Sequence, residues 1–79
     1  MDGNYVLERF DEVKTLIIKD GTGQLETKKY DGKIDIDSVK VNVAKQIILI
    51  GDDMKNYQLD GNQLTLTEGD GSQDIYTKQ

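Results

Sequence analysis

Hydrophobic and polar positions alternate most clearly in the segment from Tyr57 to Thr67. Apolar or aromatic side chains occupy every second position on either side of Asp60-Gly61. A period of two residues is typical of a strand with one buried face, because successive side chains point to opposite sides of a sheet. Asp-Gly favours a hairpin, since both residues tolerate a positive φ. The segment therefore predicts two antiparallel strands joined by a tight turn.

The same design recurs along the whole chain. Apolar runs are separated by turn signals about every ten residues, and five of these signals are Asp-Gly pairs. Of the 15 acidic residues, 11 are Asp, which favours turns, rather than Glu, which favours helices. This pattern predicts an all-β fold of eight or nine short strands. The expected strands are 3–10, 15–19, 24–30, 33–37, 39–43, 47–50, 54–59, 64–67 and 73–78.

Four places carry more specific expectations. The alternation slips by one residue at Asp37-Ser38, which predicts a bulge, or a tight turn that separates two strands. The apolar run Ile47–Ile50 predicts a strand buried on both faces. The polar run Gln24–Tyr30 predicts an edge or solvent-exposed strand. In the last strand, Ile75 is expected to point inward and Tyr76 outward.

The short connections determine the expected architecture. Tight turns join antiparallel strands, and an antiparallel meander removes its edges most easily by closing on itself. We therefore predict one domain over residues 1–79, an antiparallel meander closed into a small barrel rather than a sandwich. A chain of this length buries only about 60–65% of its unfolded surface, so its core is small.

Composition excludes several kinds of chemistry. The chain has no His and no Cys, so it lacks the commonest general base, any thiolate and any cysteine metal site. Its net charge of −5 argues against nucleic acid as a partner. No stretch has the apolar length of a transmembrane helix. The paired carboxylates Asp35 with Asp37, Asp52-Asp53 and Glu68 with Asp70 fit turns and polar strand faces. We expect no catalytic residue, no metal and no other cofactor.

Several short motifs resemble those of a known family. Gly3-Asn4-Tyr5 opens the first strand, and Leu16–Gly23 forms a strand that ends in an Asp-Gly-Thr turn. Closing hairpins are formed by Tyr57–Thr67, Asp70-Gly71 and Ile75–Lys78. Together these motifs resemble the lipocalin-like (calycin) group, in particular the short domains of bacterial secreted proteins and lipoproteins. Tyr5 stands where that group has the Trp of a Gly-x-Trp motif. The chain is also much shorter than a ligand-carrying lipocalin.

The resemblance implies an extracytoplasmic domain that binds a small molecule or a protein partner. Our first hypothesis is a non-enzymatic binding module that takes a small apolar ligand at one barrel mouth. The expected location is extracellular or at the cell surface, with a native leader removed, and a cytosolic protein is the alternative. The residues expected to line the ligand site are Tyr5, Ile17, Ile48, Tyr57 and Leu66, with Met54 as a further contact at the opening.

The second hypothesis is a protein-interaction or inhibitor-like domain that holds no internal ligand. Such a domain would use a sheet edge or a surface loop, and Gln24–Tyr30 offers the best edge. Because an edge can also pair two copies of the chain, a monomer and an edge-paired homodimer are both open. A cavity favours the first hypothesis, whereas an exposed apolar patch favours the second.

Overall fold

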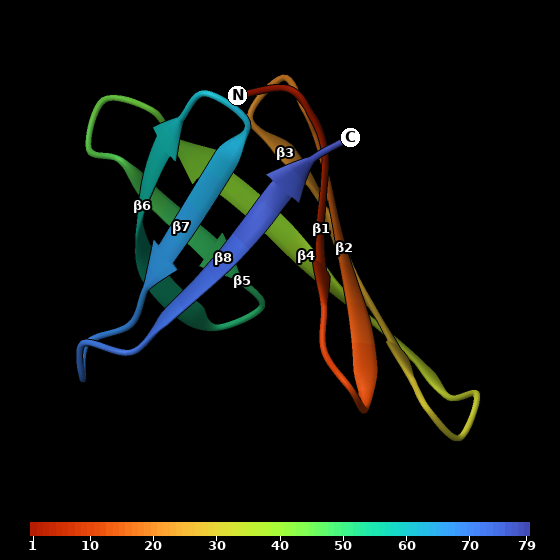
Figure 1. Ribbon diagram of the computed structural model, residues 1–79. Coiled ribbons are helices and arrows are strands. Elements are labelled where there is room, and N and C mark those ends of the chain that lie inside the picture. The colour runs from red at the N-terminus through yellow and green to blue at the C-terminus, as the bar shows by residue number, and fades with distance from the viewer.

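The computed structural model describes residues 1–79 and shows an all-β protein (Figure 1). Each strand pairs antiparallel with the next, and the last strand pairs with the first, so that the sheet forms a closed barrel. This confirms the predicted meander and barrel, with eight strands. The structure has no helix that could cross a membrane. The strands are β1 (Gly3–Glu8), β2 (Glu12–Lys19), β3 (Thr22–Lys29), β4 (Ile34–Asn42), β5 (Ile47–Ile50), β6 (Asp53–Asp60), β7 (Gln63–Thr67) and β8 (Gln73–Lys78).

Alternate side chains of the strands fill the interior of the barrel. Inward residues lie opposite each other in the ladders, as Tyr5 does with Leu16 and Tyr57 with Leu66. Burying an aliphatic side chain such as that of Leu16 or Leu66 stabilises the fold by about 1.5–3 kcal/mol. The predicted alternation is therefore the pattern that builds the core. Its eleven residues are Tyr5, Leu16, Ile18, Leu25, Val39, Ile48, Ile50, Tyr57, Leu64, Leu66 and Tyr76.

In β8 the expected faces are reversed. Tyr76 is 1% exposed and belongs to the core, whereas Ile75 is 47% exposed on the outer side. The pairing with β7 sets this orientation, because Tyr76 lies opposite the buried Leu64. The prediction was wrong because a strand with apolar residues on both faces does not reveal which face is inward.

In β5 one face is buried more deeply than the other. Ile48 and Ile50 belong to the core, whereas Ile47 and Leu49 are only partly buried. The predicted burial on both faces is thus incomplete, because nothing covers the outside of the barrel at this strand.

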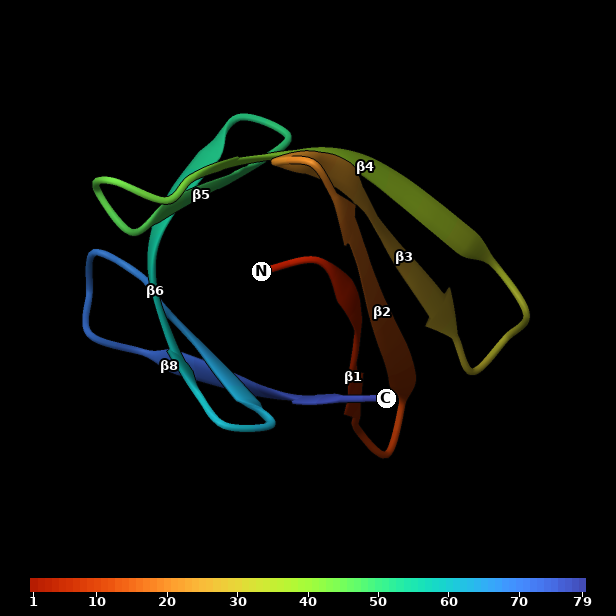
Figure 2. The same cartoon turned by 90° about the horizontal axis from the view of Figure 1, so that it is seen from above.

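The phase slip at Asp37-Ser38 lies inside one continuous strand, β4. Its pairing with β3 runs without interruption from Lys40 to Ile34, so the expected bulge or turn is wrong. Ile34 and Ile36 point outward, whereas Val39 points into the core. The β3–β4 hairpin projects beyond the barrel wall, as Figures 1 and 2 show, and no interior exists there to bury an inward apolar residue.

The polar strand β3 is not an edge. It pairs with β2 from Thr22 to Lys29 and with β4 from Thr22 to Lys28. The edge predicted at Gln24–Tyr30 is therefore wrong, and so is pairing of two copies through it. Its outer face is polar because it contacts solvent, while Leu25 and Thr27 point inward and are buried.

The N-terminal segment covers one end of the barrel. In Figure 2 it reaches over the centre of the ring of strands. Met1 packs against the core, and the Tyr5 hydroxyl donates a hydrogen bond to the Met1 carbonyl at 3.1 Å. Gly3 has a φ of +142°, and a Cβ there would lie 2.9 Å from Cε of Lys78. We call this the covered end, defined by Met1, Gly3, Tyr5 and Lys78.

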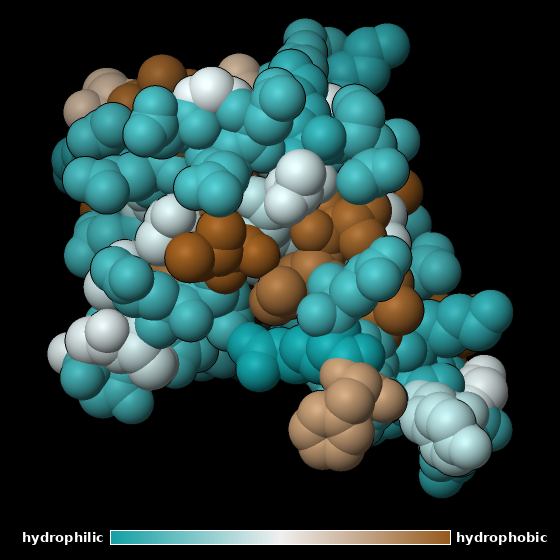
Figure 3. Space-filling model, viewed as in Figure 1, coloured by the Kyte–Doolittle hydropathy of each residue, from teal (hydrophilic) through white to brown (hydrophobic).

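The seam that closes the barrel is short. Only Tyr5 with Lys78 and Val6 with Thr77 are paired between β1 and β8. Away from the covered end the two strands diverge (Figure 1). Figure 3 shows a cluster of apolar side chains on the surface in this region, while most of the visible face is hydrophilic.

Candidate functional site: the charged mouth

The end of the barrel opposite the covered end is open and lined by polar side chains. Along each strand the inward positions continue past the core, but their chemistry changes from apolar to polar. Because the period of two is kept, these side chains still point toward the barrel axis. Each of these polar residues lies two positions from a core residue on the same strand, on the side of the mouth. They are Lys14 on β2, Thr27 on β3, Asp37 on β4, Lys55 on β6 and Asp74 on β8. We call this set the charged mouth.

A pocket of about 390 Å³ opens within the charged mouth. This volume lies in the range of about 300–1,000 Å³ that is usual for small-molecule sites. The core residues Leu25 and Ile50 contribute to its wall, and most of the other lining residues are polar or charged. The lining residues are Lys14, Leu25, Thr27, Asp37, Ile50, Gly51, Asp52, Asp53 and Lys55.

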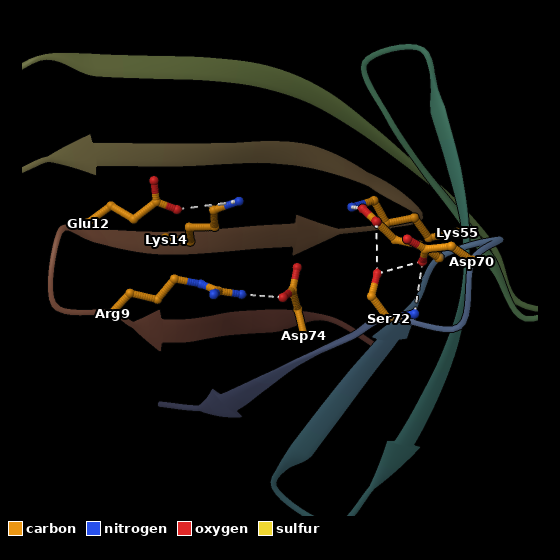
Figure 4. A network of polar contacts seen from close by, with 8 residues as sticks. Arg9, Glu12, Lys14, Lys55, Asp70, Ser72 and Asp74 are labelled. Atoms are coloured by element: carbon orange, nitrogen blue, oxygen red, sulfur yellow. Dashed lines mark hydrogen bonds and ion pairs between the residues drawn. The ribbon is translucent and has the colours of Figure 1, made fainter.

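Lys55 is held by the loop that joins β7 to β8 (Figure 4). Its Nζ lies 2.6 Å from Oε1 of Glu68, and its side chain is only 13% exposed. The Ser72 hydroxyl bridges Oε2 of Glu68 at 3.0 Å and Oδ1 of Asp70 at 2.7 Å. The Lys55 ammonium, followed by the Ser72 hydroxyl, lowers the pKa of Glu68. The Ser72 backbone N–H, followed by its hydroxyl, lowers the pKa of Asp70.

Two further ion pairs lie on the β1–β2 side of the mouth (Figure 4). Arg9 pairs with Asp74 and so connects the β1–β2 turn to β8. This ion pair lies closer to the mouth than the paired part of the seam does. Lys14 lies 3.6 Å from Oε2 of Glu12, which is a loose contact. Lys14 therefore has more donor capacity left for a ligand than Lys55 has.

Two buried hydroxyl-bearing residues point toward the mouth without a partner in the chain. Tyr76 is 1% exposed and Thr27 8%, and neither side chain makes a hydrogen bond within the protein. Neither oxygen is sealed from solvent, because the chain contains no fully buried polar side-chain atom without a partner. Burial raises the pKa of Tyr76, and the nearby Asp74 carboxylate raises it further. Both groups can therefore bind water or a ligand in the mouth.

The structure places the five predicted lining residues in two different environments. Tyr5, Ile48, Tyr57 and Leu66 lie together in the core and are at most 5% exposed. Ile17 lies on the outer face and is 37% exposed, so its place in an interior lining is a correction. It points outward because its neighbours Leu16 and Ile18 both point inward.

The charged mouth was missed from the sequence, although one signal for it was present. Lys14 lies two residues before the core residue Leu16, and Lys55 two residues before Tyr57, so both lysines fall on the inward-facing side of their strands. Met54, expected at the opening, is 67% exposed and points outward, because its neighbour Lys55 points inward. Continuing the inward alternation past the last apolar residue would have identified the two lysines.

A closed, eight-stranded meander with one covered end and one open, ligand-sized mouth defines a lipocalin-like barrel. Among solved structures, a lipocalin lipoprotein affecting virulence in Streptococcus pneumoniae matches with a TM-score of 0.90 and 31% sequence identity, over 98% of this chain and 90% of that one. A second structure from S. pneumoniae, assigned as a lipoprotein, matches with a TM-score of 0.91 and 31% identity, over 99% and 91% of the two chains. The chain belongs to the lipocalin-like family that these structures represent. No protein-family model and no curated protein sequence matches it.

Proposed function

We propose that the protein is a non-enzymatic binding module that acts outside the cytoplasm and takes a small polar ligand in the charged mouth. The similar structures are of proteins described as lipoproteins, which supports a place at the cell surface. The observation that carries the ligand site is the pocket of about 390 Å³ in the charged mouth, whose lining combines Lys14 and Thr27 with exposed carboxylates. The Thr27 and Tyr76 hydroxyls reach solvent, so a polar ligand that replaces water there can hydrogen-bond to groups that have no partner in the chain.

The packing of the interior favours a polar ligand over the apolar one first expected. Tyr5, Ile48 and Leu66 are at most 1% exposed, so an apolar ligand among them would have to displace core side chains. Overpacking a core in this way costs about 1–3 kcal/mol or more. The pocket in the mouth needs no such displacement, and its polar lining would leave an apolar ligand poorly matched.

The distribution of charge suggests the chemistry of the ligand. Lys14 and Lys55 are partly buried, with side chains 25% and 13% exposed. Lys55 is already paired with Glu68, whereas the loose contact of Lys14 with Glu12 leaves its ammonium group able to bind an anionic group such as a carboxylate. Asp37, Asp52 and Asp53 also line the pocket and are exposed, where they can accept hydrogen bonds from an ammonium or hydroxyl group. The proposed ligand is therefore a small molecule that carries an anionic group and a hydrogen-bond donor, such as a zwitterion.

Native mass spectrometry of freshly purified protein, beside a denatured control, tests whether a ligand is carried from the cell. NMR titration with a small zwitterion, a simple carboxylate and a fatty acid then locates the site. We expect amide shifts at Lys14, Thr27 and Lys55 with the polar probes. Replacing Lys14 by Gln should weaken binding about tenfold, the usual loss for a charge-assisted hydrogen bond.

Lys45→Gln provides a matched control, because Lys45 is exposed in the β4–β5 turn and lies outside the pocket. This variant should bind the polar probes as the wild type does. Binding of the fatty acid alone, with shifts at Tyr5 and Leu66, would contradict the polar site and restore the apolar one.

A further inference from the structure

Exposed apolar side chains are concentrated on one side of the barrel, on the outer face of β2, β3 and β4 and on the turns beside it. Figure 2 shows these strands along one side, with the β3–β4 hairpin projecting from it. Six of the ten exposed large hydrophobic residues belong to this region. They are Phe10, Val13, Ile17, Tyr30, Ile34 and Ile36, with exposures between 37% and 98%.

Two charged residues lie in the middle of these apolar side chains. Lys28 lies between Val13 on β2 and Ile34 on β4, its neighbours in the two ladders. Glu26, two residues before Lys28 on β3, lies in the same way between Thr15 on β2 and Ile36 on β4. Neither Lys28 nor Glu26 forms an ion pair within the chain. We call these two rows of three residues the outer face.

The outer face is complementary to itself under a two-fold rotation. If two copies pack face to face about an axis across the strands, midway between the two rows, each row meets the other row of the second copy. Lys28 then lies on Glu26 of the second copy, and Ile34 lies on its Ile36. The same rotation brings Tyr30, which lies just past the end of β3 in the turn that follows, towards the row in which Ile17 and Gln24 pair.

We propose that the protein forms a two-fold homodimer through the outer face. A two-fold interface requires one patch that complements itself, and opposite charges two residues apart on one strand fulfil this condition. An axis parallel to the strands would instead place Lys28 on Lys28, so the charges also select the orientation. The contact involves three strands and is small, which predicts a weak dimer. Because the outer face lies outside the barrel, the charged mouth stays open, and the dimer does not depend on the proposed ligand.

Sedimentation velocity over a range of protein concentrations tests the dimer with charge reversals. Lys28→Glu and Glu26→Lys each place like charges together at two symmetry-related positions, so each should weaken the dimer at least tenfold, about the effect of one lost close charge pair. The double variant K28E/E26K restores opposite charges and should dimerise again. Lys45→Glu, a matched charge reversal away from the outer face, should dimerise as the wild type does.

Mixing the two single variants gives the sharpest result. One variant carries two acids on the outer face and the other carries two lysines, so the mixture should form a heterodimer although neither variant dimerises alone. A wild type that stays monomeric at all concentrations would overturn the proposal. A dimer that is unaffected by both charge reversals, or a mixture that fails to associate, would overturn it too, because the contact between two copies would then not be formed by the outer face.

Discussion

The covered end and the charged mouth lie at opposite ends of the same barrel interior, yet only the covered end is filled by side chains of the protein. At the covered end Tyr5 donates to the Met1 carbonyl, and Met1 packs on the core. At the mouth the hydroxyl of Tyr76 has no partner in the chain, and charged residues replace apolar ones. Burial is the largest influence raising the pKa of both tyrosines. The difference shows that hydrogen-bonding partners, rather than depth alone, distinguish a structural tyrosine from one available to a ligand.

The largest expected difference compares two neighbouring inward positions on β2. Leu16→Ala should reduce the free energy of unfolding by about 2–5 kcal/mol, because Leu16 is fully buried and its loss leaves a cavity. Lys14→Ala should cost less than about 1 kcal/mol, because Lys14 lies in the mouth and its contact with Glu12 is loose. Urea unfolding measures both. Equal losses would show that the mouth is part of the packed core.

A smaller effect separates the two tyrosines. Tyr5→Phe removes the hydrogen bond to Met1 and should cost about 1 kcal/mol, or a fall in Tm of about 4–8 °C for a domain of this size. Tyr76→Phe removes a hydroxyl without a partner in the chain, so its Tm should stay within about 2 °C of the wild type. Calorimetry measures both changes. Binding of the polar probes should show the opposite order, with Tyr76→Phe weakened and Tyr5→Phe unaffected. A large fall in Tm for Tyr76→Phe would mean that its hydroxyl has a structural role.

The sequence predicted the fold better than the site, for a physical reason. Local alternation and Asp-Gly turns are properties of neighbouring residues, so hairpins such as Tyr57–Thr67 could be recognised directly. Which face of β8 points inward depends on its register with β7, and the prediction for Ile75 and Tyr76 failed there. The same limit applies to β4, where Ile34 and Ile36 face outward because the hairpin has left the barrel.

The charged mouth combines residues from strands that are far apart in sequence. Lys14 and Lys55 line one pocket, but no short motif contains them both. Searching the apolar residues for a lining therefore identified the core, with Tyr5, Tyr57 and Leu66, and missed the pocket beside it. Closing the meander in register and then following the inward positions to their ends is the step that reveals such a site.

The smallest expected effect is a dependence of stability on acidic pH that arises at the β7–β8 loop beside the mouth. The pKa of Glu68 is lowered in the folded protein, chiefly by Lys55, and that of Asp70 by Ser72. A lowered folded pKa contributes stability above the unfolded pKa, and this contribution is lost as the pH falls through the folded value. Tm should therefore fall on acidification through the carboxylate range, and Glu68→Gln should flatten part of that fall.

The effect should be small and sensitive to salt, because both carboxylates are exposed and exposed pairs are strongly screened. Calorimetry across the acidic range, at low and high salt, compares the wild type with Glu68→Gln and with Ser72→Ala. Ser72→Ala removes the hydroxyl bonds to both carboxylates but leaves the backbone N–H that Asp70 accepts, so it should act less on Asp70 than on Glu68. If Glu68→Gln leaves the acid-dependent fall in Tm unchanged, the ion pair with Lys55 does not hold the β7–β8 loop at the mouth. Lys55 would then be available to the proposed ligand, as Lys14 is in the proposal.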